Sequence, residues 1–388
     1  MVTTAIKAAD RAALLGFSDI VKIRNRVLEM KGRGERVLQL EGGEPFLNTP
    51  DHIKQAMKDA LDQNQTRYAP SSGIPQLLGA IRSKLVRHNR MDVSSGDIIV
   101  NAGGLHALFC AFQSAVNPGD EVMFFSPYWT PIRDSVSFAG GVAVRIPWDE
   151  VRGKNDLTSN LSSRLTSKTR VIYVNTPGNP TGDVLNRTQV ESIARFAQEN
   201  NLVVISDEAY EDLVYDGEHV SIGSLPGMFP RTMTTFTLSK SFSMTGWRIG
   251  YTVADKTFMD PLRKLVLNTV NGVSTPTQFA ATAAINQQGQ SFAPIREEYR
   301  KRRDLLVRGL NEAGFRCLTP PGAFYLFPDC RERLGADSWK AMETLLARTS
   351  VASVPGVVFG PEGEGHLRMS FSTSMEVIEQ AVDALKKL

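Results

Sequence analysis

The sequence predicts an α/β fold in which helices cover a mostly parallel sheet (a large domain), with a smaller α+β domain at the C-terminal end. Short apolar runs alternate with helical segments from residue 97 onward, which is typical of parallel strands buried on both faces. A second, shorter set of helices and strands follows. The 388 residues are enough for two domains. We expect an N-terminal arm and part of the small domain at 1–45, the large domain at 46–290 and the C-terminal small domain at 291–388.

Strands of the large domain are expected where consecutive apolar residues end in turn or polar residues. These runs are 98–101, 121–126, 142–147, 171–175, 203–207, 234–238 and 249–254. Apolar residues at helical spacing predict helices at 18–30, 51–63, 75–90, 105–116, 189–198 and 258–270. In the C-terminal part we expect helices at 294–313, 339–347 and 375–387, and strands at 323–327, 351–355 and 367–371. Ligands of such sheets bind at the carboxyl ends of the strands.

The composition excludes several classes of protein. The net charge of +3 comes from 44 basic and 41 acidic residues, so neither nucleic acid nor an anionic membrane is an expected partner. No apolar stretch reaches the length of about 18 residues that a spanning helix needs. The three cysteines are widely spaced, and neither they nor the five histidines show metal-binding spacing. We therefore expect no disulfide framework, no metal and a cytoplasmic location.

The most informative stretch contains Lys240 and Arg248 on either side of a turn of small residues. Lys240 follows an apolar strand, where a solvated surface lysine, the ordinary alternative, is uncommon. Desolvation and nearby cations lower the pKa of such an amine and make it nucleophilic. Lysine can form a Schiff base with a carbonyl, and Arg248 can hold a phosphate through two hydrogen bonds. This pair therefore suits a cofactor that carries both an aldehyde and a phosphate.

Asp207 ends the strand at 203–207, and Tyr210 follows three residues later. Asp207 could cap a helix, or it could pair as a buried carboxylate with a pyridinium N–H. In the second role we expect a nearby cation to keep its pKa low. Tyr210 could simply pack its ring, or it could donate a hydrogen bond to the cofactor's 3-oxygen, which Asn179 could share. The presence of Lys240 favours the cofactor roles.

An anion site is predicted where the strand at 98–101 turns into the next helix. Gly103 and Gly104 lie at that turn, and free N–H groups at a helix start bind phosphate. Arg248 would supply the counter-charge, and Thr237 a hydroxyl.

Two further side chains have both a structural and a functional interpretation. Trp129 could be a core aromatic or could stack on a flat cofactor ring, with Tyr128 as the second choice. Arg368 lies between apolar neighbours in the strand at 367–371. It could form an internal ion pair, or it could bind a substrate α-carboxylate through two hydrogen bonds.

These residues together resemble the pyridoxal-phosphate-dependent class I aminotransferases, the aspartate-aminotransferase-like branch of fold type I. The resemblance covers nearly the whole chain. It rests on Gly42-Gly43-Glu44-Pro45, Tyr68-Ala69-Pro70, Gly73-Ile74-Pro75, Ser126-Pro127-Tyr128-Trp129, Asn179-Pro180-Thr181-Gly182, Asp207-Glu208-Ala209-Tyr210, the segment from Lys240 to Arg248, and Gly322-Ala323-Phe324-Tyr325.

The resemblance implies a role for each predicted site residue. Lys240 would bind the cofactor as a Schiff base and shuttle protons, Asp207 would hold the ring nitrogen, and Trp129 would stack on the ring. The remaining implied cofactor ligands are Asn179 and Tyr210 for the 3-oxygen, and Gly104, Leu105, Thr237 and Arg248 for the phosphate. Substrate binding is implied for Gly43, Trp129, Asn179 and Arg368. Tyr68 would reach the phosphate of a neighbouring subunit, which implies a homodimer.

This sequence departs from the family pattern at two phosphate positions. Leu105 stands where a small hydroxyl residue is frequent, and Thr237 stands where serine or glycine is commoner. The segment 270–275 lacks the arginine of many dicarboxylate-selective relatives, so aspartate is neither supported nor excluded as a substrate.

The expected cofactor is pyridoxal 5'-phosphate, and the expected activity moves an amino group between an L-amino acid and a 2-oxo acid with ping-pong kinetics. A C–S β-lyase or other chemistry on the same Schiff base is the first alternative. A non-catalytic cofactor-binding regulator is the second, disfavoured because only 41 residues precede the Gly42 loop, too few for a typical DNA-binding domain.

Overall fold

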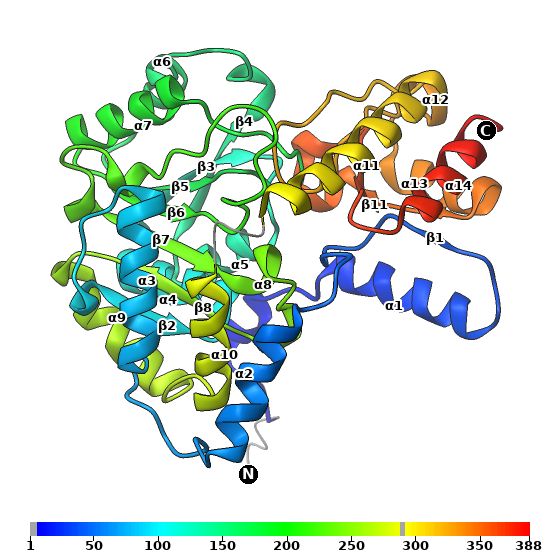
Figure 1. The fold of residues 1–388 in the computed structure, drawn as a ribbon. Helices are drawn as coiled ribbons and strands as arrows, with labels where there is room; N and C mark the ends of the chain where they lie inside the picture. Colours follow the sequence, from blue (N-terminus) through cyan, green and yellow to red (C-terminus); the bar gives the residue numbers. More distant parts are fainter. Residues whose placement is uncertain (1–5, 288–291) are drawn as a thin grey trace, which may run out of the picture.

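The computed structural model describes residues 6–287 and 292–388. Its centre is a seven-stranded sheet with the order β2-β8-β7-β6-β5-β3-β4 (Figure 1). The strands are β2 (Ile98–Asn101), β3 (Glu121–Ser126), β4 (Val142–Pro147), β5 (Thr169–Asn175), β6 (Val203–Asp207), β7 (Thr232–Thr237) and β8 (Gly250–Val253). Only β8 is antiparallel to its neighbours in this sheet. The mostly parallel sheet is therefore confirmed.

Alternate residues of the strands supply two layers of core, as strands buried on both faces require. Tyr173 of β5 belongs to the cluster with α4 (Gly104–Ala115), α5 (Pro131–Phe138) and α9 (Lys256–Thr269). Its neighbour Ile172 belongs to the cluster with α6 (Thr158–Ser162) and α7 (Arg187–Glu199). At the β2–β8 end, α2 (Asp51–Asp62), α3 (Pro75–Lys84) and α10 (Thr275–Asn286) cover the sheet.

The C-terminal part builds two small sheets of its own. One pairs β1 (Leu38–Gln39) with β10 (Val351–Ala352), and the other has the order β11-β12-β9, from Val354–Pro355, Leu367–Ser370 and Tyr325–Leu326. Helices α11 (Phe292–Glu312), α12 (Arg331–Leu334), α13 (Ser338–Thr349) and α14 (Met375–Leu385) surround them. Figure 1 shows α1 (Asp19–Gly32) beside this part. The expected boundary at 290/291 lies outside the described residues.

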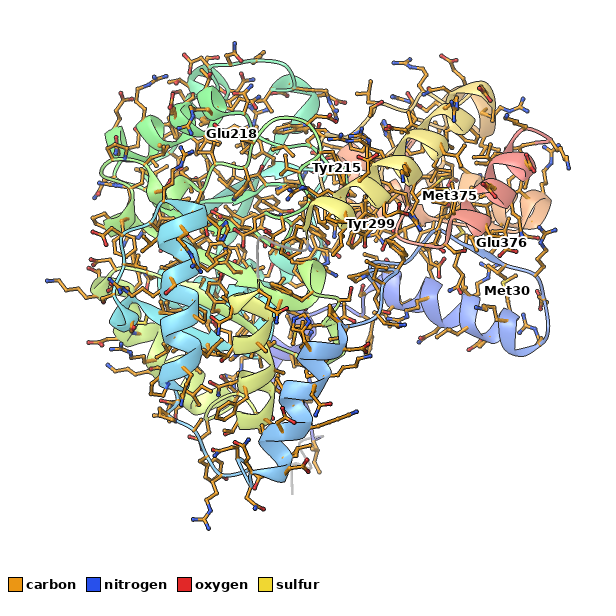
Figure 2. The ribbon with its side chains drawn as sticks, in the orientation of Figure 1. Met30, Tyr215, Glu218, Tyr299, Met375 and Glu376 are labelled. Atoms are coloured by element: carbon orange, nitrogen blue, oxygen red, sulfur yellow. The ribbon has the colours of Figure 1, made fainter. Side chains whose placement is uncertain are left out.

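The two parts meet through aromatic side chains. Tyr215 and Tyr299 lie at the junction in Figure 2 and belong to one buried cluster. The Tyr299 ring stacks on Phe324 with centroids 5.8 Å apart, and Tyr215 lies 6.1 Å from Phe371. Tyr215 also donates a hydrogen bond to the carbonyl of Ala323. These contacts fix the loop after β6 against the strands that carry Tyr325 and Arg368.

Several predicted bounds differ from the structure for local reasons. Leu238 begins a one-turn helix, α8 (Leu238–Ser241), in place of ending β7. The run 351–355 divides at Ser353 into β10 and β11, which join different sheets. Helix α10 was not predicted, because its buried residues include the polar Thr277 and Gln278 as well as alanines. Its sequence therefore shows no apolar face that is distinct from a polar one.

Candidate active site

A cavity of about 490 Å³ lies at the carboxyl ends of the central strands, where ligands of open α/β sheets bind. It is lined by every predicted site residue except Tyr68. Those residues are Gly43, Gly104, Leu105, Trp129, Asn179, Asp207, Tyr210, Thr237, Lys240, Arg248 and Arg368. The strands β5, β6 and β7 end at this cavity, which explains how residues far apart in the sequence converge.

Lys240 lies on α8, directly after β7, and its amine is held inside the cavity. Its Nζ donates a hydrogen bond of 2.6 Å to the Gly43 carbonyl and lies 6.0 Å from the centre of the Tyr210 ring. The pKa of Lys240 is lowered to about 8, chiefly by burial. The charges of Arg368 and Arg248 also lower it, and those of Glu44 and Asp207 act to raise it. The predicted direction is confirmed, and the cause is chiefly desolvation.

Asp207 ends β6 with its carboxylate buried beneath the cavity. Its Oδ2 accepts a hydrogen bond of 2.8 Å from Tyr173 Oη, and its Oδ1 accepts one of 3.2 Å from the Ala209 N–H. Burial raises the pKa of Asp207 to about 6, because desolvation outweighs these hydrogen bonds and the Lys240 charge. The expectation that a cation keeps this pKa low is therefore wrong. Above pH 6 the carboxylate is nevertheless mostly ionised.

The start of α4 forms an anion cradle with Arg248. Gly103 precedes the helix with a φ of 84°, and a Cβ there would lie 2.5 Å from Arg248 Nη2, so only glycine allows the guanidinium this close. A Cβ on Gly104 would lie 3.2 Å from Thr237 Cβ. The first N–H groups of α4 have no partner within the helix, and Ser239 adds a hydroxyl beside Thr237. A phosphate fits this donor set.

Arg368 is a buried cation whose hydrogen bonds within the described part of the chain go to neutral acceptors. Its Nη1 donates to Asn179 Oδ1 at 3.2 Å and its Nη2 to the Glu41 carbonyl at 2.7 Å, while Nε has no partner among the described residues. The guanidinium lies 4.5 Å from the ring centre of Tyr325. Because a buried charge is costly without a counter-ion, these contacts argue against the internal ion pair and favour an anionic ligand.

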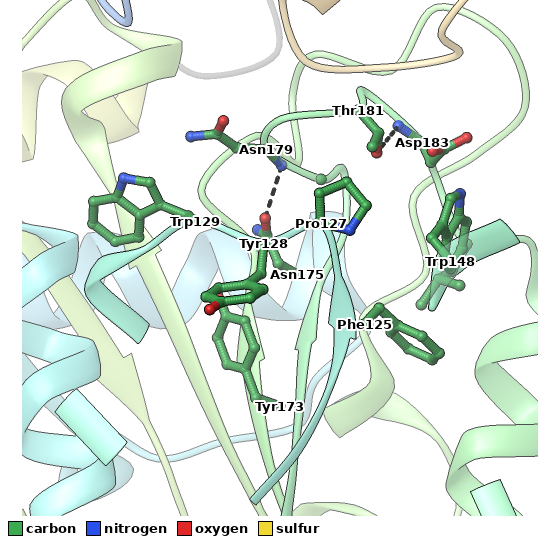
Figure 3. Close-up of a pocket in the computed structure, with 12 residues that line it drawn as sticks. Phe125, Pro127, Tyr128, Trp129, Trp148, Tyr173, Asn175, Asn179, Thr181 and Asp183 are labelled. Carbon is green, nitrogen blue, oxygen red and sulfur yellow. Dashed lines mark hydrogen bonds between the residues drawn. The ribbon is translucent and has the colours of Figure 1, made fainter. Parts of the chain in front are cut away.

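Tyr210 and Asn179 approach the cavity from two different loops. Tyr210 Oη shares a hydrogen bond of 2.9 Å with Tyr325 Oη, and burial raises the pKa of Tyr210 well above its ordinary value. The Asn179 N–H donates to Asn175 Oδ1 at 2.9 Å, as the dashed line in Figure 3 shows. Asn175 and Tyr325 were not predicted as site residues. Tyr325 belongs to the Gly322–Tyr325 motif and Asn175 ends a predicted strand, but neither pattern assigns a role, so only the folded contacts show that both side chains reach the cavity.

Trp129 and Tyr128 point in different directions. Figure 3 shows the Trp129 ring turned away from Tyr128, beside a narrow secondary cavity of about 40 Å³. Trp129 also lines the main cavity, whereas Tyr128 is buried against Phe124 with ring centres 4.7 Å apart. The preference for Trp129 over Tyr128 agrees with this placement.

Two predicted ligands differ from the others in their surroundings. Tyr68 is 92% exposed and does not line the cavity of its own chain. Leu105 is 43% exposed, and its apolar side chain can offer a phosphate only the backbone N–H.

Comparisons with known proteins agree with this geometry. The model of the aminotransferase class I and II family matches residues 35–385. An aspartate/prephenate aminotransferase of Thermus thermophilus is 37% identical over 374 residues, 96% of each chain. Aromatic-amino-acid aminotransferase 2 of Thermococcus litoralis is 35% identical, over 98% of this chain and 97% of its own. The structure of the Thermus thermophilus aspartate aminotransferase with maleate superimposes with a TM-score of 0.94 at 36% identity, over 99% of this chain and all of that one.

These matches confirm the predicted fold type, the dependence on pyridoxal phosphate and the enzyme class, an aminotransferase. All three relatives are named as aminotransferases, so their names support neither the lyase nor the regulator. Within the described residues no helix is both long and apolar enough to cross a membrane. From residue 35 to residue 385, the chain belongs to the aminotransferase class I and II family.

Proposed function

We propose that this cavity moves an amino group between an L-amino acid and a 2-oxo acid, with Lys240 as the reactive amine. The observation that supports this most is the convergence of an amine with a lowered pKa, a buried carboxylate and an anion cradle in one cavity. When bound there, pyridoxal phosphate supplies an aldehyde and a protonated ring that accepts the electron pair of the substrate α-carbon. The two half-reactions share the site, so we expect ping-pong kinetics.

Lys240 would carry the proton during the reaction. With a pKa of about 8, about a quarter of the amine is unprotonated at pH 7.5, against about a thousandth for an ordinary lysine. Nζ can therefore take the α-proton of the amino acid and return it elsewhere. Asp207 would hold the pyridine N–H, and its ionised form is required for that.

The other residues would fix the ligands. The α4 start, at Gly104 and Leu105, with Thr237 and Arg248, would bind the phosphate, and Trp129 would cover the ring. Asn179 and Tyr210 would hold the 3-oxygen. Arg368 would bind the substrate α-carboxylate next to Gly43 and Asn179. Bound in this way, the substrate would have its α-carbon close to Lys240.

A homodimer with shared sites is part of this proposal, and its support is the position of Tyr68. An almost fully exposed tyrosine outside its own cavity can serve as a phosphate ligand only in a second copy of the chain. A cytoplasmic location also stays a proposal, supported by three cysteines that are all unpaired and buried.

Replacing Lys240 tests the central role. We expect Lys240→Ala to lose turnover by at least about 10²–10⁴-fold, the usual contribution of a positioned acid–base group. Borohydride treatment in the presence of the cofactor should add mass to the peptide that contains residue 240 in the wild type, but not in Lys240→Ala. The exposed Lys256→Ala is the matched control and should behave like the wild type. Wild-type turnover by Lys240→Ala would refute the proposal.

Replacing Arg368 tests substrate binding. Arg368→Lys keeps the charge but loses the two-pronged geometry, so we expect KM for the amino acid to rise about tenfold to a hundredfold, with the affinity for pyridoxal phosphate unchanged. Arg302→Lys is the control, because Arg302 is also buried but pairs with Glu298 away from the cavity. An unchanged KM in Arg368→Lys would leave the guanidinium with a structural role only.

The shared site is tested by mixing two variants. Tyr68→Ala should bind pyridoxal phosphate more weakly, and Lys240→Ala should be inactive. In mixed dimers one site regains both residues, so at limiting cofactor the mixture should recover up to about a quarter of the wild-type activity. A sedimentation experiment that finds only monomers, or a mixture no more active than its components, contradicts the homodimer.

A further inference from the structure

Glu208 is a buried carboxylate directly next to Asp207 that the proposed mechanism does not use. Its side chain is wholly buried, and the Ser206 hydroxyl donates to it at 2.9 Å and the Ser221 hydroxyl at 2.7 Å. Ser206 and Asp207, the last two residues of β6, point to opposite sides of the strand. The Glu208 side chain lies on the side of Ser206, which donates to it, and Asp207 meets Tyr173 on the other. The Glu208 carboxylate is thus a second buried negative charge, next to the Asp207 carboxylate that lines the cavity.

His219 is the only cationic side chain of the described residues that pairs with Glu208. Its Nε2 lies 2.8 Å from Glu208 Oε2. The nearby Glu211 has its own cation, Lys84, which is buried and hydrogen-bonded to it, and Asn89 Nδ2 donates to its other oxygen at 2.7 Å. The carboxylates of Glu208 and Glu211 and the ammonium of Lys84 together carry one net negative charge. A protonated His219 brings the net charge of this buried cluster to zero.

The surroundings favour the charged form of this pair. Burial alone would lower the pKa of His219, but the Glu208 carboxylate raises it, with Glu211 acting in the same direction and Lys84 against it. Burial would likewise raise the pKa of Glu208, yet His219 and the hydroxyls of Ser221 and Ser206 lower it. Glu208, Glu211 and His219 also have the spacing of a cation site, which is empty in this structure. Since the Lys84 ammonium already neutralises Glu211, this spacing carries no metal proposal.

We propose that His219 is a positioning residue of the cofactor site, whose charge neutralises Glu208 so that Asp207 stays ionised opposite the cofactor ring. This rests on the proposed role of Asp207. Burial is the largest cause of the raised pKa of Asp207, and the Glu208 charge also acts to raise it. Tyr173, Ala209 and Lys240 act to lower it. At about 6 that pKa lies just below neutrality, so loss of the positive charge of His219, which faces Glu208, would increase the protonated fraction of Asp207 near pH 7.

The test measures binding of pyridoxamine 5'-phosphate to cofactor-free protein by fluorescence between pH 5 and 9. Pyridoxamine phosphate needs no covalent bond to Lys240, so its affinity reports the charge of Asp207. His219→Gln keeps a hydrogen-bond donor and removes the charge, and a like charge raises a carboxyl pKa by about one pH unit. We expect the acid midpoint to rise by that amount, with affinity at pH 7 about twofold weaker, affinity at pH 5 nearly tenfold weaker and affinity at pH 9 unchanged.

Glu208→Gln should not raise the midpoint, because it removes the charge that His219 neutralises and His219 also loses the carboxylate that raises its pKa. The double variant should lie near the wild type. Ser221→Ala removes a hydrogen bond to Glu208 without a charge and should leave the midpoint in place. A uniform loss of affinity at all pH values, or shifts of the same sign in both single variants, would overturn the role of His219. If His219→Gln does not fold, a raised midpoint in Glu208→Gln overturns the role of His219 by itself. Asp207→Asn separates the two proposals: an unchanged acid limb in that variant refutes Asp207 itself.

Discussion

Desolvation at the carboxyl ends of β6 and β7 is the constraint on which the site depends. Removal from water disfavours the charged forms of both Lys240 and Asp207. It lowers the pKa of the amine to about 8 and raises that of the carboxyl to about 6. Between these values Asp207 is mostly ionised and Lys240 has an increasing neutral fraction. A base and an anion can therefore coexist in one cavity near neutral pH, which the ordinary pKa of a lysine would not allow.

The fold supplies this environment through parts that are distant in the sequence. The parallel strands end together, so Asp207 and Lys240 face one cavity, and the start of α4 adds N–H donors close to Arg248. The C-terminal part closes the cavity through β9 and β12, which bring Tyr325 and Arg368. The charges of Arg368 and Arg248 each lower the pKa of the Lys240 amine a little further. Binding groups for anionic ligands and activation of the amine thus share the same electrostatic origin.

Much of this site could be predicted because its chemistry sits in local patterns. Lys240 and Asp207 each follow an apolar strand, and the Gly103–Gly104 turn marks a helix start. Asn175 ends a predicted strand and Tyr325 closes a motif, but neither pattern assigns a role, and His219 has no local signal. All three act through contacts made only in the folded chain. The pKa of Asp207 was expected to fall, because a sequence shows neighbouring charges more readily than the depth of burial. The helix α10 was missed because its sequence shows no apolar face that is distinct from a polar one.

The central claim is that burial makes the Lys240 amine available near neutral pH. Competitive labelling of the cofactor-free protein with acetic anhydride, followed by mass spectrometry across pH 6–11, measures this for each lysine separately. We predict half-maximal labelling of Lys240 near its pKa of about 8, and half-maximal labelling of a free lysine derivative added to the same mixture near about 10.4. If Lys240 titrates together with that free lysine derivative, burial does not activate the amine, which contradicts the proposed role of Lys240.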